Sequence, residues 1–186
     1  MRRIGQRHNM PGTRREARRV LNETEISDRI APGALARLIE MHALYYAREW
    51  GFGAFFEARV AREAGDFVGA LPRADSRLWL VRADNRIVGS IAIDGRHAAT
   101  DGAHLRWFIL DDSSRGVGAG GKLLDAALAF CRERRFSQVH LSTFAGLDAA
   151  RRLYESRGFR LVAENEAESW GARVREQTFV LDLRAA

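Results

Sequence analysis

Glycine recurs at every second position in one short segment of this chain, Arg115-Gly116-Val117-Gly118-Ala119-Gly120. Because glycine has no Cβ, a ligand can approach the backbone of such a segment closely. An apolar, strand-like stretch precedes the segment and a helical pattern follows it, so its amides lie at a helix start, where they have no partners within the helix. Together with the helix dipole and the guanidinium of Arg115, these amides favour an anion, and a pyrophosphate is the natural ligand.

Two other phosphate-binding loops do not match the residues of this segment. A Walker loop needs a lysine followed by serine or threonine, whereas Lys122 is followed by Leu123. A dinucleotide-binding fingerprint needs a different spacing of its third glycine and a parallel strand order, and the pattern before this loop is antiparallel. A glycine-rich turn without a ligand explains the three glycines about as well as an anion site does. The choice between an anion site and a turn without a ligand therefore depends on the surrounding elements and on any resemblance to a known family.

The hydrophobic periodicity switches repeatedly between the strand and the helix pattern from residue 23 onward. It predicts strands over 24–30, 77–83, 86–94, 104–110, 139–143, 159–163 and 174–183, and helices over 32–49, 54–71, 119–135 and 147–157. Asp84-Asn85 suits a tight hairpin turn, Pro32 suits the first turn of a helix, and Gly158 suits a helix stop. The predicted fold class is α/β: one domain with a mixed, mostly antiparallel sheet of about seven strands and helices on both faces.

The net charge of +6 is located entirely in the first 19 residues, which carry seven arginines against one acid, Glu16. The remainder of the chain is formally neutral, so the high charge does not indicate a nucleic-acid-binding face on the folded part. We expect residues 1–22 to form a disordered basic extension, followed by one domain over residues 23–186. Binding of nucleic acid through this extension is a third functional possibility, and it would be strongly salt-dependent.

Composition also limits the location and the kind of site. No apolar run approaches the ~20 residues that cross a bilayer, and the N-terminus lacks the apolar core of a secretory signal, so we expect a cytoplasmic protein. The single cysteine, Cys131, permits no intrachain disulfide, and its helical pattern indicates a buried thiol. Five scattered histidines form no metal motif, so we predict no metal site.

Beyond the loop, the sequence resembles the GNAT superfamily of N-acyltransferases. Arg115, Gly118 and Gly120 match the family signature R/Q-x-x-G-x-G/A, and the order of predicted elements fits residues 24–183. The segment 150–159, Ala-Arg-Arg-Leu-Tyr-Glu-Ser-Arg-Gly-Phe, resembles the family pattern A-x-x-L-Y-x-x-x-G-F. The arrangement, including residues 45–56, is especially similar to GNAT domains fused to MarR-type repressors, although no repressor pattern occurs in these 186 residues.

This resemblance implies acetyl-CoA as co-substrate and a GNAT-type sheet. The amides of residues 115–120 would hold the CoA pyrophosphate, and the strand residues Phe108, Ile109 and Leu110 would lie along the pantetheine arm. In the family the fourth and fifth strands splay apart to admit that arm. Between Leu105 and Phe108 the apolar register shifts by one residue, which indicates a β-bulge that would open the sheet.

Acyl transfer to an amine needs a neutral nitrogen, a donor for the oxyanion and a proton for the departing thiolate. Tyr154, in the matched segment, is the candidate proton donor, because a phenol stays protonated at neutral pH; the alternative is a core tyrosine. Glu49 is the candidate general base, and His104 and Glu57 are further options. A strand amide such as that of Leu110 would supply the oxyanion donor.

The acceptor is expected to bind near aromatic side chains of the first two helices and the last loop, chiefly Tyr46, Trp50 and Trp170. The resulting prediction is direct acetyl transfer from acetyl-CoA to a primary amine in a ternary complex. The main alternative is a non-catalytic acyl-CoA-binding sensor, in which the loop is kept and turnover is lost. A homodimer is possible, because dimers are common in the family.

Overall fold

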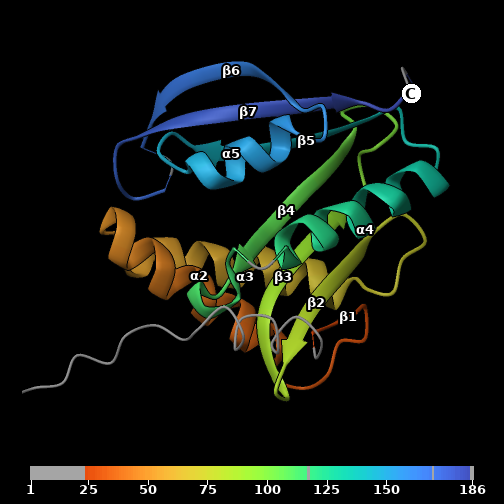
Figure 1. The fold of residues 1–186 in the computed structure, drawn as a ribbon. Helices are drawn as coiled ribbons and strands as arrows, with labels where there is room; N and C mark the ends of the chain where they lie inside the picture. Colours follow the sequence, from red (N-terminus) through yellow and green to blue (C-terminus); the bar gives the residue numbers. More distant parts are fainter. Residues whose placement is uncertain (1–23, 117, 169, 185–186) are drawn as a thin grey trace, which may run out of the picture.

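The computed structural model describes residues 24–116, 118–168 and 170–184, which form one seven-stranded sheet in the order β1-β2-β3-β4-β5-β7-β6 (Figure 1). The strands are β1 (Glu25–Ser27), β2 (Arg77–Ala83), β3 (Arg86–Asp94), β4 (Ala103–Leu110), β5 (Gln138–Phe144), β6 (Arg160–Ala167) and β7 (Val174–Asp182). Neighbouring strands are antiparallel except for β4 and β5, which are parallel. The predicted mixed, mostly antiparallel sheet is confirmed.

Within the described residues, four α-helices cover the two faces of this sheet. They are α2 (Ala34–Trp50), α3 (Ala54–Gly69), α4 (Ala119–Glu133) and α5 (Asp148–Glu155), with a short 3₁₀ turn η1 (Asp112–Ser114) before α4. The apolar stripes of α2 and α3 form one buried cluster with one face of the sheet, while α4 and α5 form another with the opposite face (Figure 1). No helix in the described ranges has both the length and the apolar character that a membrane span needs.

The predicted order of strands and helices from residue 24 is confirmed, with differences at the ends. β1 has three residues instead of seven, and β6 extends to Ala167, beyond the predicted end at residue 163. Polar residues fill the second half of β6, an edge strand paired only with β7, so no apolar alternation marks its length. Asp84 and Asn85 both have positive φ, +48° and +61°, as a two-residue hairpin turn requires. The predicted extension 1–22 lies outside the described residues.

The sheet opens between β4 and β5. These strands pair only at Ala103 with Val139 and at His104 with His140, and then diverge (Figure 1). The predicted bulge is present in β4, where the register with β3 shifts and Trp107 has a φ of +47°. The Ser90 hydroxyl donates to the Trp107 carbonyl at 2.8 Å, which satisfies a group that the bulge removes from the ladder.

Candidate active site

The glycine loop presents an uncapped helix start. Gly118 is the N-cap of α4 and has φ +83°; because it has no side chain, no capping hydrogen bond reaches the first-turn amides from it. The first helical bond runs from the Lys122 amide to the Gly118 carbonyl at 3.2 Å, so the amides of residues 118–121 precede it. A Cβ added at Gly116 or Gly118 would meet no atom within 4 Å. The space beside Gly116 and Gly118 is therefore open to a ligand.

A cavity of about 400 Å³ lies against this loop, and we call it the loop cavity. It is lined by Gly116, Gly118, Gly120 and Arg115 from the loop, and by Phe108, Ile109 and Leu110 from β4. Residues of α5 form its opposite wall. Ala119 is buried as the first residue of α4 and does not line the cavity, and Val117 lies outside the described residues. The structure thus brings most of the predicted cofactor residues together.

Arg115 is held at this cavity by three contacts. Its Nε donates to the Leu110 carbonyl at 3.2 Å, and its Nη1 lies 2.9 Å from an Asp112 carboxylate oxygen. Its guanidinium carbon also lies 4.3 Å from the centroid of the Tyr45 ring. These contacts keep the guanidinium at the cavity wall, beside the loop amides at which an anion would bind.

A second cavity of about 200 Å³ lies between the sheet and the helices α2 and α3, and we call it the inner cavity. It is lined by His104 and Arg106 on β4, Phe144 on β5 and Glu176 on β7. Phe144 and Glu176 are paired across β5 and β7, so their side chains share the face that α3 covers. The inner cavity thus occupies the α2–α3 side of the opening in the sheet.

The two cavities meet at the opening between β4 and β5. Tyr46, Phe108, Thr143 and Tyr154 line both. Tyr154 is 5% exposed, and its ring centroid lies 6.0 Å from that of Phe108. Burial, and to a smaller extent the neighbouring Tyr46, raises the pKa of the Tyr154 phenol, so its proton is retained at neutral pH. A protonated phenol therefore stands at the junction of the cavities.

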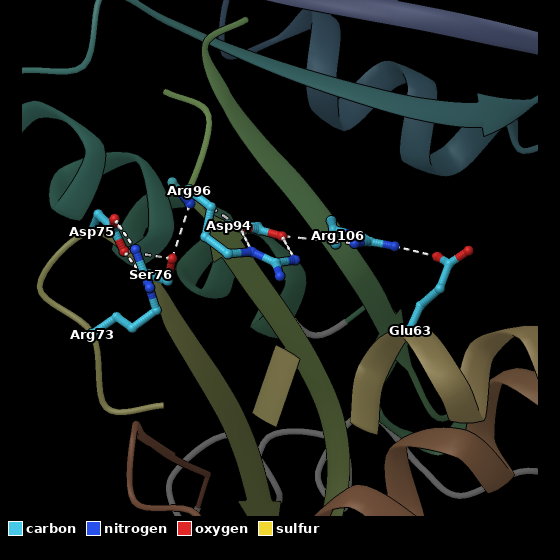
Figure 2. A network of polar contacts seen from close by, with 8 residues as sticks. Glu63, Arg73, Asp75, Ser76, Asp94, Arg96 and Arg106 are labelled. Atoms are coloured by element: carbon cyan, nitrogen blue, oxygen red, sulfur yellow. Dashed lines mark hydrogen bonds and ion pairs between the residues drawn. The ribbon is translucent and has the colours of Figure 1, made fainter. Parts of the chain in front are cut away.

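A chain of ion pairs holds one wall of the inner cavity (Figure 2). Arg106 of β4 forms an ion pair with Glu63 of α3, and its Nη1 lies 3.7 Å from the buried carboxylate of Asp94. Asp94 also accepts two hydrogen bonds from the Arg96 guanidinium, at 2.6 and 2.9 Å. Because Asp94 and Glu63 bind Arg106 from two elements, its side chain is fixed in the cavity wall.

The remaining predicted residues divide between the cavities and the surface. Trp170 lines the inner cavity, and the Arg59 guanidinium carbon lies 4.0 Å from its ring centroid. Trp50 lines neither cavity; its ring packs behind Tyr46, with a centroid distance of 5.5 Å. Glu49 also lines neither cavity, because its exposed carboxylate binds Arg48 at 2.6 Å near the end of α2. The structure therefore does not bring Glu49 together with Tyr154.

Two histidines line the inner cavity in the neutral form. Burial lowers the pKa of His42 to about 4, and burial, His140 and Arg106 lower that of His104 to about 3. His42 Nδ1 lies 2.8 Å from the Leu38 carbonyl, which can only accept, so this nitrogen carries the proton. No group of three or more histidine, cysteine or acidic side chains that could hold a metal occurs within the described ranges.

Comparison with known proteins identifies the family. The model of the Acetyltransferase (GNAT) family matches residues 35–159. The chain is 29% identical over 132 residues to N-acetylaspartate synthetase of Danio rerio, covering 70% of this chain and 46% of that protein. It thus spans about half the length of that relative.

Solved structures share the fold. A GNAT-family acetyltransferase of Staphylococcus aureus superposes with a TM-score of 0.67 at 19% identity, covering 86% of this chain and 99% of that one. A Brucella melitensis ribosomal-protein-alanine N-acetyltransferase gives 0.68 at 16% identity, with 86% and 99% coverage. A Bacillus anthracis protein solved with acetyl coenzyme A gives 0.54 at 18% identity, with 63% and 68% coverage. The chain therefore belongs to the GNAT acetyltransferase family.

Proposed function

We propose that this chain transfers an acetyl group from acetyl-CoA, bound in the loop cavity, directly to a primary amine bound in the inner cavity. The observation that carries this proposal is the junction of the two cavities at the buried Tyr154. A thioester in one cavity and an amine in the other would meet beside its phenol. Holding two reactants in this way supplies much of the rate enhancement, because the thioester is already activated.

The backbone of β4 supports the placement of the pantetheine arm. The Asp111 amide donates to Val88 of β3 at 2.8 Å, and amides alternate along a strand, so the Leu110 amide points away from β3. The Leu110 carbonyl accepts from Arg115 on the same side. Leu110, and by the same alternation Phe108, would offer backbone groups to an extended arm lying in the gap before β5.

In the reaction, the neutral amine nitrogen attacks the thioester carbonyl and the C–N bond forms as the C–S bond breaks. A free amide of β4, such as that of Leu110, would donate to the oxyanion. Tyr154 would donate its proton to the departing thiolate, and a proton leaving the acceptor nitrogen would restore the phenol. The residues of the loop cavity fit acetyl-CoA, since an uncapped helix start faces open space beside a free strand edge.

The acceptor is proposed to be a small amine that also carries a carboxylate. The relative from Danio rerio is named for the synthesis of N-acetylaspartate, an acetylated amino acid. Two arginines, Arg59 and Arg106, line the inner cavity; both form ion pairs with Glu63, and Arg106 Nη1 also lies 3.7 Å from the Asp94 carboxylate. A guanidinium in the cavity wall would bind a carboxylate of the acceptor by charge-assisted hydrogen bonds.

A screen of amine acceptors for free-thiol release from acetyl-CoA tests this function. We expect turnover with amino acids, with L-aspartate as the first candidate, and weaker turnover with amines that lack a carboxylate. Tight acetyl-CoA binding by calorimetry with no thiol release from any amine would contradict catalysis and favour the acyl-CoA sensor. A cytoplasmic location, a homodimer and a particular likeness to MarR-fused GNAT domains remain proposals from the sequence.

A further inference from the structure

Four charged side chains line the inner cavity, and one of them has no hydrogen-bond or ion-pair partner among the described residues. Arg59, Arg106 and Glu63 form a cluster, in which Glu63 accepts from Arg59 Nε at 2.8 Å and from Arg106. Glu176 stands apart from it. Its half-buried carboxylate makes no hydrogen bond or ion pair with any residue of the described chain. An unpaired carboxylate in a cavity is available to a cationic ligand.

Strand pairing places Glu176 close to the junction of the cavities. It lies on β7 directly opposite Phe144, and Thr143, the residue before Phe144, lines both cavities. The Phe144 ring packs edge-on against Tyr46, another junction residue, with centroids 5.6 Å apart. Directly opposed residues have Cβ atoms about 5 Å apart. Glu176 therefore reaches the inner cavity near the opening through which Tyr154 is approached.

The other proton acceptors of the inner cavity are less suited to an ammonium group. Glu63 already binds two guanidinium groups, those of Arg59 and Arg106, which occupy its carboxylate. His42 and His104 are neutral, so they offer a cation no charge. Glu176 combines a carboxylate with the absence of a described partner, so it is the proton acceptor of this cavity that best suits an ammonium group.

We propose that Glu176 binds the ammonium group of the acceptor and removes its proton, an inference that rests on the proposed function. One proton passes from the ammonium to the Glu176 carboxylate, leaving a lone pair on nitrogen. That lone pair forms the C–N bond, and the C–S electron pair leaves with sulfur, which Tyr154 protonates. The second proton of the nitrogen restores the Tyr154 phenol, and Glu176 returns its proton to solvent, so atoms and charge balance.

The test uses the full chain and two probe amines of similar size. Ethylamine is an ammonium ion at neutral pH, whereas 2,2,2-trifluoroethylamine is mostly neutral and needs no base. For Glu176→Gln we expect kcat/KM with ethylamine to fall about 10²-fold, and with trifluoroethylamine less than about tenfold. Acetyl-CoA affinity, measured by calorimetry, should not change. Glu166→Gln is the matched control, because this exposed residue of β6 lines neither cavity.

Glu176→Asp, which keeps the carboxylate, should recover ethylamine turnover to within about tenfold of wild type. Equal losses with both probes, or no loss with ethylamine, would overturn the role of Glu176 while leaving the acyltransferase intact. A wild-type chain that binds acetyl-CoA but acetylates no amine would overturn the proposed function, and this inference with it. Melting curves of Glu176→Gln should match wild type, because no partner is lost.

Discussion

Replacing Tyr154 by phenylalanine removes one oxygen atom at the junction of the two cavities. The ring keeps its contacts, with centroids 6.0 Å from Phe108 and 5.8 Å from Phe159. The hydroxyl makes no hydrogen bond within the described part of the chain, so its loss leaves no partner unsatisfied. We therefore expect the free energy of unfolding to change by less than about 0.5 kcal/mol.

The expected effect on the reaction is much larger. If the Tyr154 phenol protonates the thiolate, kcat should fall about 10²-fold, which corresponds to about 2.7 kcal/mol in the activation free energy. Burial raises the pKa of this phenol. Each pKa unit of that increase makes proton transfer from Tyr154 to the thiolate about 1.4 kcal/mol less favourable. The proton therefore moves late, as charge develops on sulfur. Acetyl-CoA affinity should be retained.

The assay is thiol release at saturating acceptor, with acetyl-CoA affinity measured by calorimetry. Tyr46→Phe is the matched variant, because the Tyr46 ring also lines both cavities. Near-wild-type kcat for Tyr154→Phe would refute the assignment. If Tyr46→Phe alone lost turnover, the proton would come from Tyr46 instead.

Two further predictions concern the loop and a buried histidine. In the variants Gly118→Asp and Gly118→Asn, both introduced residues tolerate the positive φ, but only Asp adds a negative charge that would face the pyrophosphate. The repulsion between these two charges would be about 3 kcal/mol at ~5 Å. Calorimetry should therefore give about 10²-fold weaker acetyl-CoA binding for Asp and less than tenfold for Asn; equal losses would exclude a charge effect. His42 takes up its proton near pH 4 in the folded chain and near pH 6.5 in the unfolded chain. Its contribution to the free energy of unfolding is therefore fully present above pH 6.5, and it falls by up to about 3 kcal/mol as the pH is lowered to 4. Thermal melts of His42→Gln should show a flatter acid limb, and an unchanged limb would contradict this.

Local rules predicted the turn, the loop and the bulge that depend on adjacent residues. The Asp84-Asn85 turn, the glycine loop and the bulge before Phe108 each follow from a few adjacent residues, and all three are present. Side-chain spacing also places Glu49 three residues after Tyr46, on the same side of a helix. The Glu49 side chain nevertheless does not reach the cavities. α2 ends at the next residue, Trp50, and Arg48 binds the Glu49 carboxylate at the surface.

The inner cavity could not be predicted in the same way. Arg106, Glu176 and Glu63 come from β4, β7 and α3, and the sequence does not state which strands are neighbours. Glu176 lies in an alternating strand pattern that identifies a face but not what covers it. Only the pairing of Phe144 with Glu176 brings it to the opening in the sheet. The alternating pattern within one strand does not contain this pairing between strands distant in the sequence.

The positions of the nucleophilic side chains favour direct transfer over a covalent acyl-enzyme. Cys131, the single cysteine, is fully buried in α4 and lines neither cavity, and burial raises its pKa to about 12. Such a thiol has neither the access nor the thiolate form that attack on a thioester requires. Apart from the two tyrosines, the described residue with a hydroxyl at the junction is Thr143. His42 and His104 line the inner cavity but not the loop cavity. In the proposed reaction the acetyl group passes directly through the gap between β4 and β5, so that reaction depends on the bulge that opens the sheet as well as on the residues that move protons.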